Sequence, residues 1–144
     1  MTNRFFSGIA SLLGVFLAGY WAGSAQSTLH AQSENRVFEL RTYHAYPGKL
    51  DPLLARFRDH TVGIFNEHGM RSIGYWLPTD EPLKGHTLIY MLAFPSRDAA
   101  TKSWAEFRND PAWKKVQTAS EANGKLVEEV DSVFLDPTDF SNIK

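Results

Sequence analysis

The chain has 144 residues, which suits one domain, and its 15 basic and 16 acidic residues leave a formal net charge of −1. This balance gives no basic surface of the kind that binds nucleic acid. The chain has no cysteine, which excludes disulfides, a thiol nucleophile and a cysteine-linked lipid anchor. Core packing and, for a small domain, association must therefore supply the stability.

The first 25 residues have the pattern of an export signal. Arg4 precedes an uncharged, mostly apolar run over residues 5–23, and small residues follow, which predicts a secretory leader cleaved after Ala25. The run is also close to the roughly 20 residues that span a bilayer, so an uncleaved N-terminal anchor is the alternative. Both interpretations predict an exported domain, periplasmic or extracellular, joined to the leader by a polar linker over residues 26–35.

The folded domain is expected over residues 36–140. Alternating side chains predict a first strand over residues 36–44, which ends at a Pro-Gly turn. An amphipathic helix is predicted over residues 49–69, because residues at three- and four-residue spacing form one stripe: Leu50, Leu54, Phe57, Thr61, Ile64 and His68. Two further strands are predicted over residues 71–77 and 86–94, joined by a turn-rich connection.

The second helical region is predicted in two pieces. Ser96 has the side chain and position of an N-cap, and the helix that it begins is expected to break at Asp110-Pro111. Asp110 can cap a new helix, and Pro111 fits its first position. Asn123-Gly124 ends this helix, and a fourth strand is expected over residues 125–135.

This order of elements is the split β-α-β order of a ferredoxin-like α+β fold, β-α-β-β-α-β, with a four-stranded antiparallel sheet and both helices on one face. The strand over residues 86–94 is apolar on both sides, which is typical of a strand whose two faces are covered. The helices cover only one face. We therefore expect a homodimer in which two sheets close into a dimeric α+β barrel.

Three segments resemble the signature blocks of the NIPSNAP family: FELRTYHAYPGKL near the start of the domain, HGMRSIGYW after the first helix, and WAEFRNDPAWKK in the second helical region. The resemblance extends over residues 37–134 and implies the dimeric α+β barrel fold. Relatives in that superfamily include small monooxygenases, haem-degrading enzymes and haem peroxidases, and also many members with no established activity. The resemblance therefore implies a fold directly and a function only by analogy.

Glu39, Arg41 and Tyr43 leave the same side of the first predicted strand, because strand side chains alternate with period two. We expect this side to line the barrel between two subunits. A carboxylate and a guanidinium buried there must pair with each other or meet a polar ligand. A structural ion pair is the favoured interpretation; the alternatives are an acid or base beside an anion-binding guanidinium, and a solvent-exposed face.

Two histidines and two aromatic residues complete the candidates. His68 lies at the end of the apolar stripe and His60 near its edge, and a core or capping role is favoured for both over ligation of a haem. No histidine pair or joined acidic cluster has the spacing of a metal site. Trp76 and Tyr90 can form a flat wall for a ring-shaped ligand, although core filling is favoured for each.

The leading hypothesis is an exported, homodimeric NIPSNAP-like domain that binds a small, partly apolar molecule in the barrel cavity. The candidate ligand-binding residues are Glu39, Arg41, Tyr43, His68, Trp76 and Tyr90. One alternative is a cofactor-independent or haem-linked monooxygenase, with Glu39 or His68 as proton acceptor and Arg41 holding an anionic group. Another is a purely structural or interaction dimer. No cofactor, metal or nucleic acid is expected, and membrane contact is expected only through an uncleaved apolar run.

Overall fold

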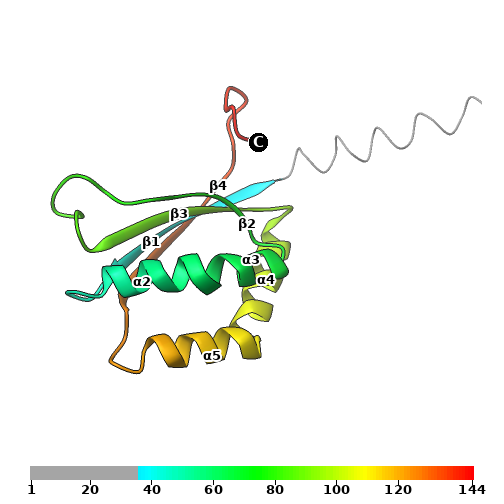
Figure 1. Ribbon diagram of the computed structural model, residues 1–144. Coiled ribbons are helices and arrows are strands. Elements are labelled where there is room, and N and C mark those ends of the chain that lie inside the picture. Colours follow the sequence, from blue (N-terminus) through cyan, green and yellow to red (C-terminus); the bar gives the residue numbers. More distant parts are fainter. Residues whose placement is uncertain (1–35) are drawn as a thin grey trace, which may run out of the picture.

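The computed structural model describes residues 36–144 (Figure 1), and the predicted leader and linker lie outside the described residues. Within this part, none of the helices combines the length and apolar character needed to cross a bilayer. The elements follow the predicted order: β1 (Val37–Ala45), α2 (Leu50–Arg56), η1 (Phe57–Thr61), α3 (Val62–Glu67), β2 (Arg71–Trp76), β3 (Thr87–Phe94), α4 (Arg97–Asn109), α5 (Pro111–Ser120) and β4 (Val127–Leu135).

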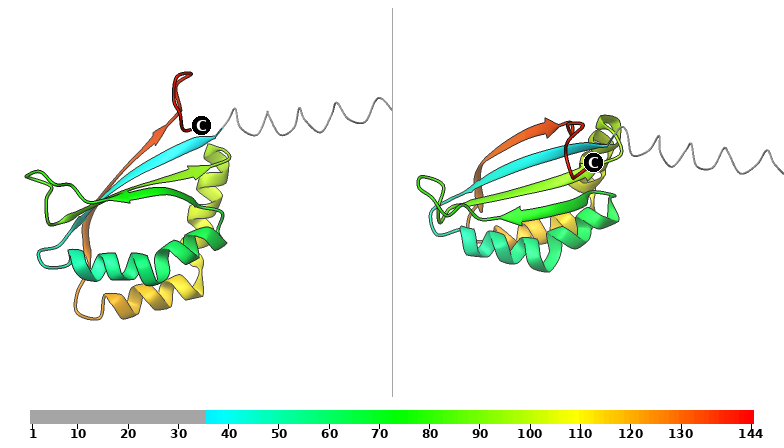
Figure 2. Two further views of the ribbon diagram at one scale, coloured as in Figure 1. Left: turned by 45° about the horizontal axis from the view of Figure 1, so that its top comes forward. Right: turned by 90° about the horizontal axis from the view of Figure 1, so that it is seen from above.

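The four strands form one antiparallel sheet in the order β2-β3-β1-β4. Figure 2 shows both helical regions on the same face of this curved sheet. The register places Arg41 of β1 between Tyr90 of β3 and Ser132 of β4, so these three residues share a side of the sheet. The predicted ferredoxin-like α+β fold is confirmed.

The side of β1 that carries Glu39, Arg41 and Tyr43 faces the helices. The indole Nε1 of Trp104, in α4, donates a hydrogen bond to Glu39, and Ala45, on the same side of the strand, belongs to the core. The expectation that this side lines a space between two sheets was therefore wrong. Strand alternation defines the two sides of β1 but does not tell which of them the helices cover, and both sides mix apolar with polar residues.

The helix expected over residues 49–69 contains a π turn at η1, where the extra residue rotates the helix relative to the sheet. The buried residues before the turn, Leu53, Arg56 and Phe57, keep the regular i, i+3, i+4 spacing of one helical face, and Leu53 is more buried than Leu54. The hydroxyl of Thr61 donates to the carbonyl oxygen of Arg56 at 3.2 Å across the π turn. The buried face therefore runs through Leu53 and Arg56, and the predicted stripe ran through Leu54.

The second helical region breaks where the sequence predicts. Ser96 caps α4 by accepting a hydrogen bond from the backbone N–H of Ala99 at 3.1 Å. Asp110 caps α5 by accepting from the N–H of Ala112 at 2.6 Å, and Pro111 occupies the first helical position. Both predicted caps are confirmed, and the break lets α4 and α5 pack at different places along the first helical region (Figure 1).

The opposite face of the sheet, which we call the open face, carries no helix in the described part of the chain (Figure 2). Trp76 and Val133 lie on it and are each 49% exposed, whereas Phe38 and Ala93 are buried. A Cβ atom at Gly74 would come within 2.6 Å of the Trp76 ring, so glycine allows the indole to lie flat over β2. The open face is therefore a partly apolar, unpartnered surface.

Candidate functional site

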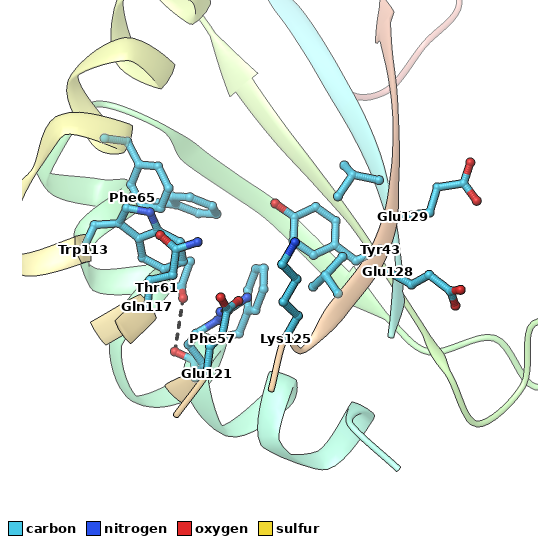
Figure 3. A pocket seen from close by; sticks show the side chains of 14 residues that line it. Tyr43, Phe57, Thr61, Phe65, Trp113, Gln117, Glu121, Lys125, Glu128 and Glu129 are labelled. Atoms are coloured by element: carbon cyan, nitrogen blue, oxygen red, sulfur yellow. Dashed lines mark hydrogen bonds and ion pairs between the residues drawn. The ribbon is translucent and has the colours of Figure 1, made fainter. Parts of the chain in front are cut away.

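A cavity of about 310 Å³ lies between the β1-β4 side of the sheet and the two helical regions (Figure 3). The π turn supplies part of one wall, α4 and α5 supply another, and β1 with the segment that leads into β4 closes the remaining side. Five of its lining residues are aromatic: Tyr43, Phe57, Phe65, Phe107 and Trp113. The polar lining residues include Arg56, Thr61, Gln117, Glu121 and Lys125.

The aromatic lining residues contact one another edge-on or at a tilt. The ring centroids of Phe57 and Tyr43 are 5.8 Å apart at 85°, and those of Phe65 and Phe107 are 4.9 Å apart. Phe107 continues to Trp113 at 4.5 Å. Such packed rings form a rigid apolar surface that suits a flat or alicyclic molecule.

Arg56 is the buried charge of the cavity, with 5% of its surface exposed. Its Nη1 atom donates to Glu121 Oε1 at 3.0 Å and lies 3.4 Å from Ser120 Oγ. Its guanidinium carbon is 5.2 Å from the centroid of the Trp113 ring. The Nε atom is buried without a hydrogen-bond partner, so the described residues satisfy this guanidinium only in part.

The side chains of the other charged residues at the cavity point in different directions. In Figure 3 the side chains of Glu128 and Glu129 point away from the cavity, whereas Lys125 stays on the cavity side of its segment, beside Tyr43. Lys125 forms no ion pair with any residue between 36 and 144. Since Arg56 and Glu121 pair with each other, Lys125 is the unpaired charge whose side chain stays on the cavity side.

Glu39 lies outside this cavity, in a network of its own. It is 1% exposed and accepts hydrogen bonds from Arg41 Nη1 at 2.6 Å, Trp104 Nε1 at 2.5 Å and Ser132 Oγ at 2.6 Å. The ion pair that the sequence favoured is therefore present. Burial by itself would lower the pKa of Arg41, but Tyr43, Tyr90 and Glu39 outweigh that effect and raise the pKa above its ordinary value. Arg41 thus stays charged.

The tyrosines on this side of the sheet form a neutral stack. The rings of Tyr75 and Tyr90 are 5.6 Å apart and nearly parallel, and Tyr43 meets Tyr90 edge-on at 5.2 Å. Burial raises the pKa of Tyr90 well above its ordinary value, and its hydroxyl has no hydrogen-bond partner. Burial also raises the pKa of Tyr75, although its hydrogen bond with Ser72 opposes the rise. Of these three phenols only Tyr43 lines the cavity.

The histidine candidates lie elsewhere. His68 Nε2 is 2.7 Å from Asp110 Oδ2, which connects the end of α3 to the junction of α4 and α5. That hydrogen bond, followed by the one from the N–H of Ala112, lowers the pKa of Asp110. His60 is exposed, and neither histidine lines the cavity, so the residues present there do not fit a haem. Among residues 36–144 no group of three or more potential ligands could hold a metal ion.

The structure thus brings only one predicted ligand-binding residue, Tyr43, to the cavity wall. Trp76 lies on the open face, and Glu39, Arg41, His68 and Tyr90 do not line the cavity. The sequence analysis missed Arg56 because the predicted stripe ran through Leu54 and Phe57. The structure buries Leu53, Arg56 and Phe57, so a stripe drawn through Leu53 includes the arginine at regular helical spacing.

The chain is similar to known proteins of one family. The model of the NIPSNAP family matches residues 38–142. A NIPSNAP family protein from Agrobacterium tumefaciens strain C58 has a TM-score of 0.67 and 24% identity, over 76% of this chain and 100% of that one. An uncharacterized NIPSNAP-like domain protein from Burkholderia xenovorans has a TM-score of 0.66 and 18% identity, over 75% and 90% of the chains.

A more distant likeness is to a variant of SnoaB, described as a cofactor-independent oxygenase from Streptomyces nogalater. It has a TM-score of 0.50 and 13% identity, over 75% of this chain and 98% of that one. No curated protein matches the chain. At these identities the similarity to solved structures shows a shared fold.

Proposed function

This chain belongs to the NIPSNAP family, and on that premise we propose that it binds a small, partly apolar molecule in the cavity between its sheet and its helices. The cavity itself carries the proposal, since packed aromatic rings and a few polar groups line its volume of about 310 Å³. Small-molecule sites typically have volumes of roughly 300–1,000 Å³ and this mixture of lining residues. The proposed site lies within one subunit, and the sequence hypothesis put it between two.

A monooxygenase that uses this cavity is the second candidate, and the fold that the chain shares with SnoaB is compatible with it. The groups first considered as proton acceptors do not line the cavity: Glu39 already accepts three hydrogen bonds, and His68 is bound to Asp110. A general base must reach the proton that it removes. The arrangement of the described residues therefore favours binding.

The binding proposal is tested on the purified protein by native mass spectrometry, which should detect a small molecule that denaturation releases. A variant that fills the cavity, Val127→Trp, should lose it, because Val127 lines the cavity. The matched control is Lys102→Trp, at an exposed position of α4 that does not line the cavity. Absence of any bound molecule, together with no binding of the neutral probe 2-naphthol, contradicts the proposal.

We also propose that the protein is a homodimer in which the open faces of two sheets meet. The support is the exposure of Trp76 and Val133 on a face that no described helix covers. Sedimentation should show a dimer for the wild-type protein and a monomer for Val133→Glu, since a carboxylate would be buried in the contact. A monomeric wild-type protein contradicts this proposal.

Export is proposed from the pattern of residues 1–25 alone. Cell fractionation with N-terminal sequencing tests it. We expect the domain outside the cytoplasm, with a chain that begins after Ala25 if the leader is cleaved or an intact membrane-bound chain if it is not. An intact chain in the cytoplasm contradicts export.

A further inference from the structure

The incomplete hydrogen bonding of Arg56 indicates the class of molecule that the cavity takes. We infer that this molecule carries a carboxylate on an apolar ring body, and that Arg56 receives the carboxylate through its Nε and Nη2 atoms. The inference rests on the proposed binding function and specifies its ligand.

A guanidinium has five N–H donors and no acceptor. In Arg56 the Nη1 group is directed at Glu121 Oε1 and Ser120 Oγ, at 3.0 and 3.4 Å. The Nε atom is buried without a partner, and Nη2 has no hydrogen bond to any residue from 36 to 144. Since only 5% of Arg56 is exposed, bulk water has little access to this guanidinium. A ligand in the adjoining cavity is the available acceptor.

The free edge of this guanidinium has a definite shape. The Nε and Nη2 donors point the same way in the plane of the group and match the two oxygens of a carboxylate. The rest of the cavity is aromatic, so the charged group must be joined to an apolar body. This combination fits an aromatic or alicyclic carboxylic acid.

The charged side chains at the cavity leave Lys125 as a second cation near Arg56. Arg56 pairs with Glu121, and the side chains of Glu128 and Glu129, which also belong to the lining, point away from the cavity in Figure 3. Lys125 has no ion-pair partner among residues 36–144. An anionic group on the ligand would therefore meet Arg56 and Lys125.

The helix explains why the charge and the rings meet. Arg56 and Phe57 follow Leu53 at i+3 and i+4 and so share its buried side, and the Thr61 hydroxyl, in the π turn, donates to the Arg56 carbonyl at 3.2 Å. The cation is thus fixed beside the aromatic wall on a helix and not on a mobile loop. Such an arrangement binds a ligand that is charged at one end and apolar at the other with little loss of side-chain freedom.

The inference is tested with two probes of the same shape, 2-naphthoate and the uncharged 2-naphthamide, by titration calorimetry on the whole protein. The acid should bind at least about tenfold more tightly than the amide, which is the usual effect of hydrogen bonds to a charged group. Arg56→Gln should remove this preference and leave binding of the amide. Lys125→Met, an exposed control that removes one cation, should weaken the acid less than Arg56→Gln does.

A further variant covers the case in which Arg56→Gln does not fold. Glu121→Gln keeps the arginine and an amide oxygen that accepts from its Nη1, and it removes a negative charge, so it should bind 2-naphthoate more tightly without a change for 2-naphthamide. Equal affinities for acid and amide in the wild-type protein, or no gain in Glu121→Gln, overturn the carboxylate inference and leave the binding proposal intact. If the wild-type protein binds neither 2-naphthoate nor 2-naphthamide, the carboxylate inference is overturned. The binding proposal is then decided separately, by native mass spectrometry of the purified protein.

Discussion

Glu39 and Arg56 are both buried charges next to aromatic rings, and they differ in how completely their hydrogen bonds are made. Glu39 accepts from an arginine, an indole and a hydroxyl, all at 2.5–2.6 Å. Arg56 directs only Nη1 at partners, at 3.0 and 3.4 Å, and its Nε is unpaired. The Glu39 carboxylate has no capacity left for a ligand. The Nε atom of its partner Arg41 is also unpaired among the described residues, but Arg41 does not line the cavity, whereas Arg56 does.

This difference separates structural from functional charges better than burial does. A buried group that is fully hydrogen-bonded holds elements together, here β1, β4 and α4 around Glu39. A buried donor without an acceptor lowers stability unless something binds it. Arg56 adjoins a cavity and Glu39 does not, so only Arg56 combines the unmet donors with the space to satisfy them.

The largest expected effect tests the structural half of this comparison. Glu39→Ala should lower the free energy of unfolding by about 3–5 kcal/mol, because it leaves the Arg41 guanidinium buried without its counter-ion. The Trp104 indole and the Ser132 hydroxyl would lose their acceptor as well. Urea denaturation measures the change.

The control for this variant is Glu39→Gln, which keeps an amide oxygen as acceptor. It should lower the free energy of unfolding less than Glu39→Ala does. Neither change should alter the ratio of 2-naphthoate to 2-naphthamide affinity, since Glu39 does not line the cavity. A change in that ratio would show that the Glu39 network belongs to the site and would remove the distinction between the two regions.

The next effect compares two serines, one at each charge. Ser132→Ala should lower the free energy of unfolding by about 1–2 kcal/mol, because the serine hydroxyl donates to the Glu39 carboxylate at 2.6 Å. Ser120→Ala should cost less than about 0.5 kcal/mol, since its oxygen is 3.4 Å from Arg56 Nη1 and the contact is long for a hydrogen bond. Thermal denaturation of the two variants side by side gives the difference, and equal losses would mean that the two charges are held equally firmly.

The fold was largely predictable because its signals are local. The Ser96 cap, the Asp110-Pro111 break and the alternation along β1 each depend on a few neighbouring residues, and all three are found in the structure. The error on the side of β1 came from a non-local property. Which side the helices cover depends on the path of the chain over the sheet, and a strand with mixed residues on both sides does not record it.

The site was much less predictable than the fold. The Glu39-Arg41 pair was foreseeable from period two, since residues two apart on a strand lie side by side. Arg56 was not, because the predicted stripe passed through Leu54 and Phe57, and the partners of its guanidinium, Ser120 and Glu121, lie at the end of α5, more than 60 residues later. Side chains brought together by tertiary packing leave no spacing in the sequence.

A third prediction concerns the π turn, in which the Thr61 hydroxyl donates to the carbonyl of Arg56. Thr61→Val keeps the shape of a fully buried side chain and removes the hydroxyl that donates to the Arg56 carbonyl, so it should cost about 1 kcal/mol. It should also weaken 2-naphthoate more than 2-naphthamide, because the backbone of Arg56 is then held less firmly. Thr61→Ser, which retains the hydroxyl, is the control for the acid preference. A preference unchanged in Thr61→Val would mean that the turn is not needed to place Arg56.

The smallest expected effect comes from a third pair, His68 and Asp110, which is less buried than the other two charges. The hydrogen bond from His68, and next the one from the Ala112 N–H, lowers the pKa of Asp110 below its ordinary value of 3.8. A lowered folded-state pKa stabilises the fold at pH values above the unfolded-state pKa, and this contribution is lost as the pH falls through the folded-state pKa.

Asp110→Asn should therefore reduce the difference in stability between about pH 7 and about pH 3, measured by urea denaturation at each pH. Asparagine can still cap α5, so the comparison isolates the charge from the cap. Asp98→Asn, at an exposed acid in the first turn of α4, is the matched control. If Asp110→Asn and the wild-type protein lose stability equally on acidification, the His68-Asp110 contact does not persist in solution, and the end of α3 is then connected to the α4-α5 junction by packing alone.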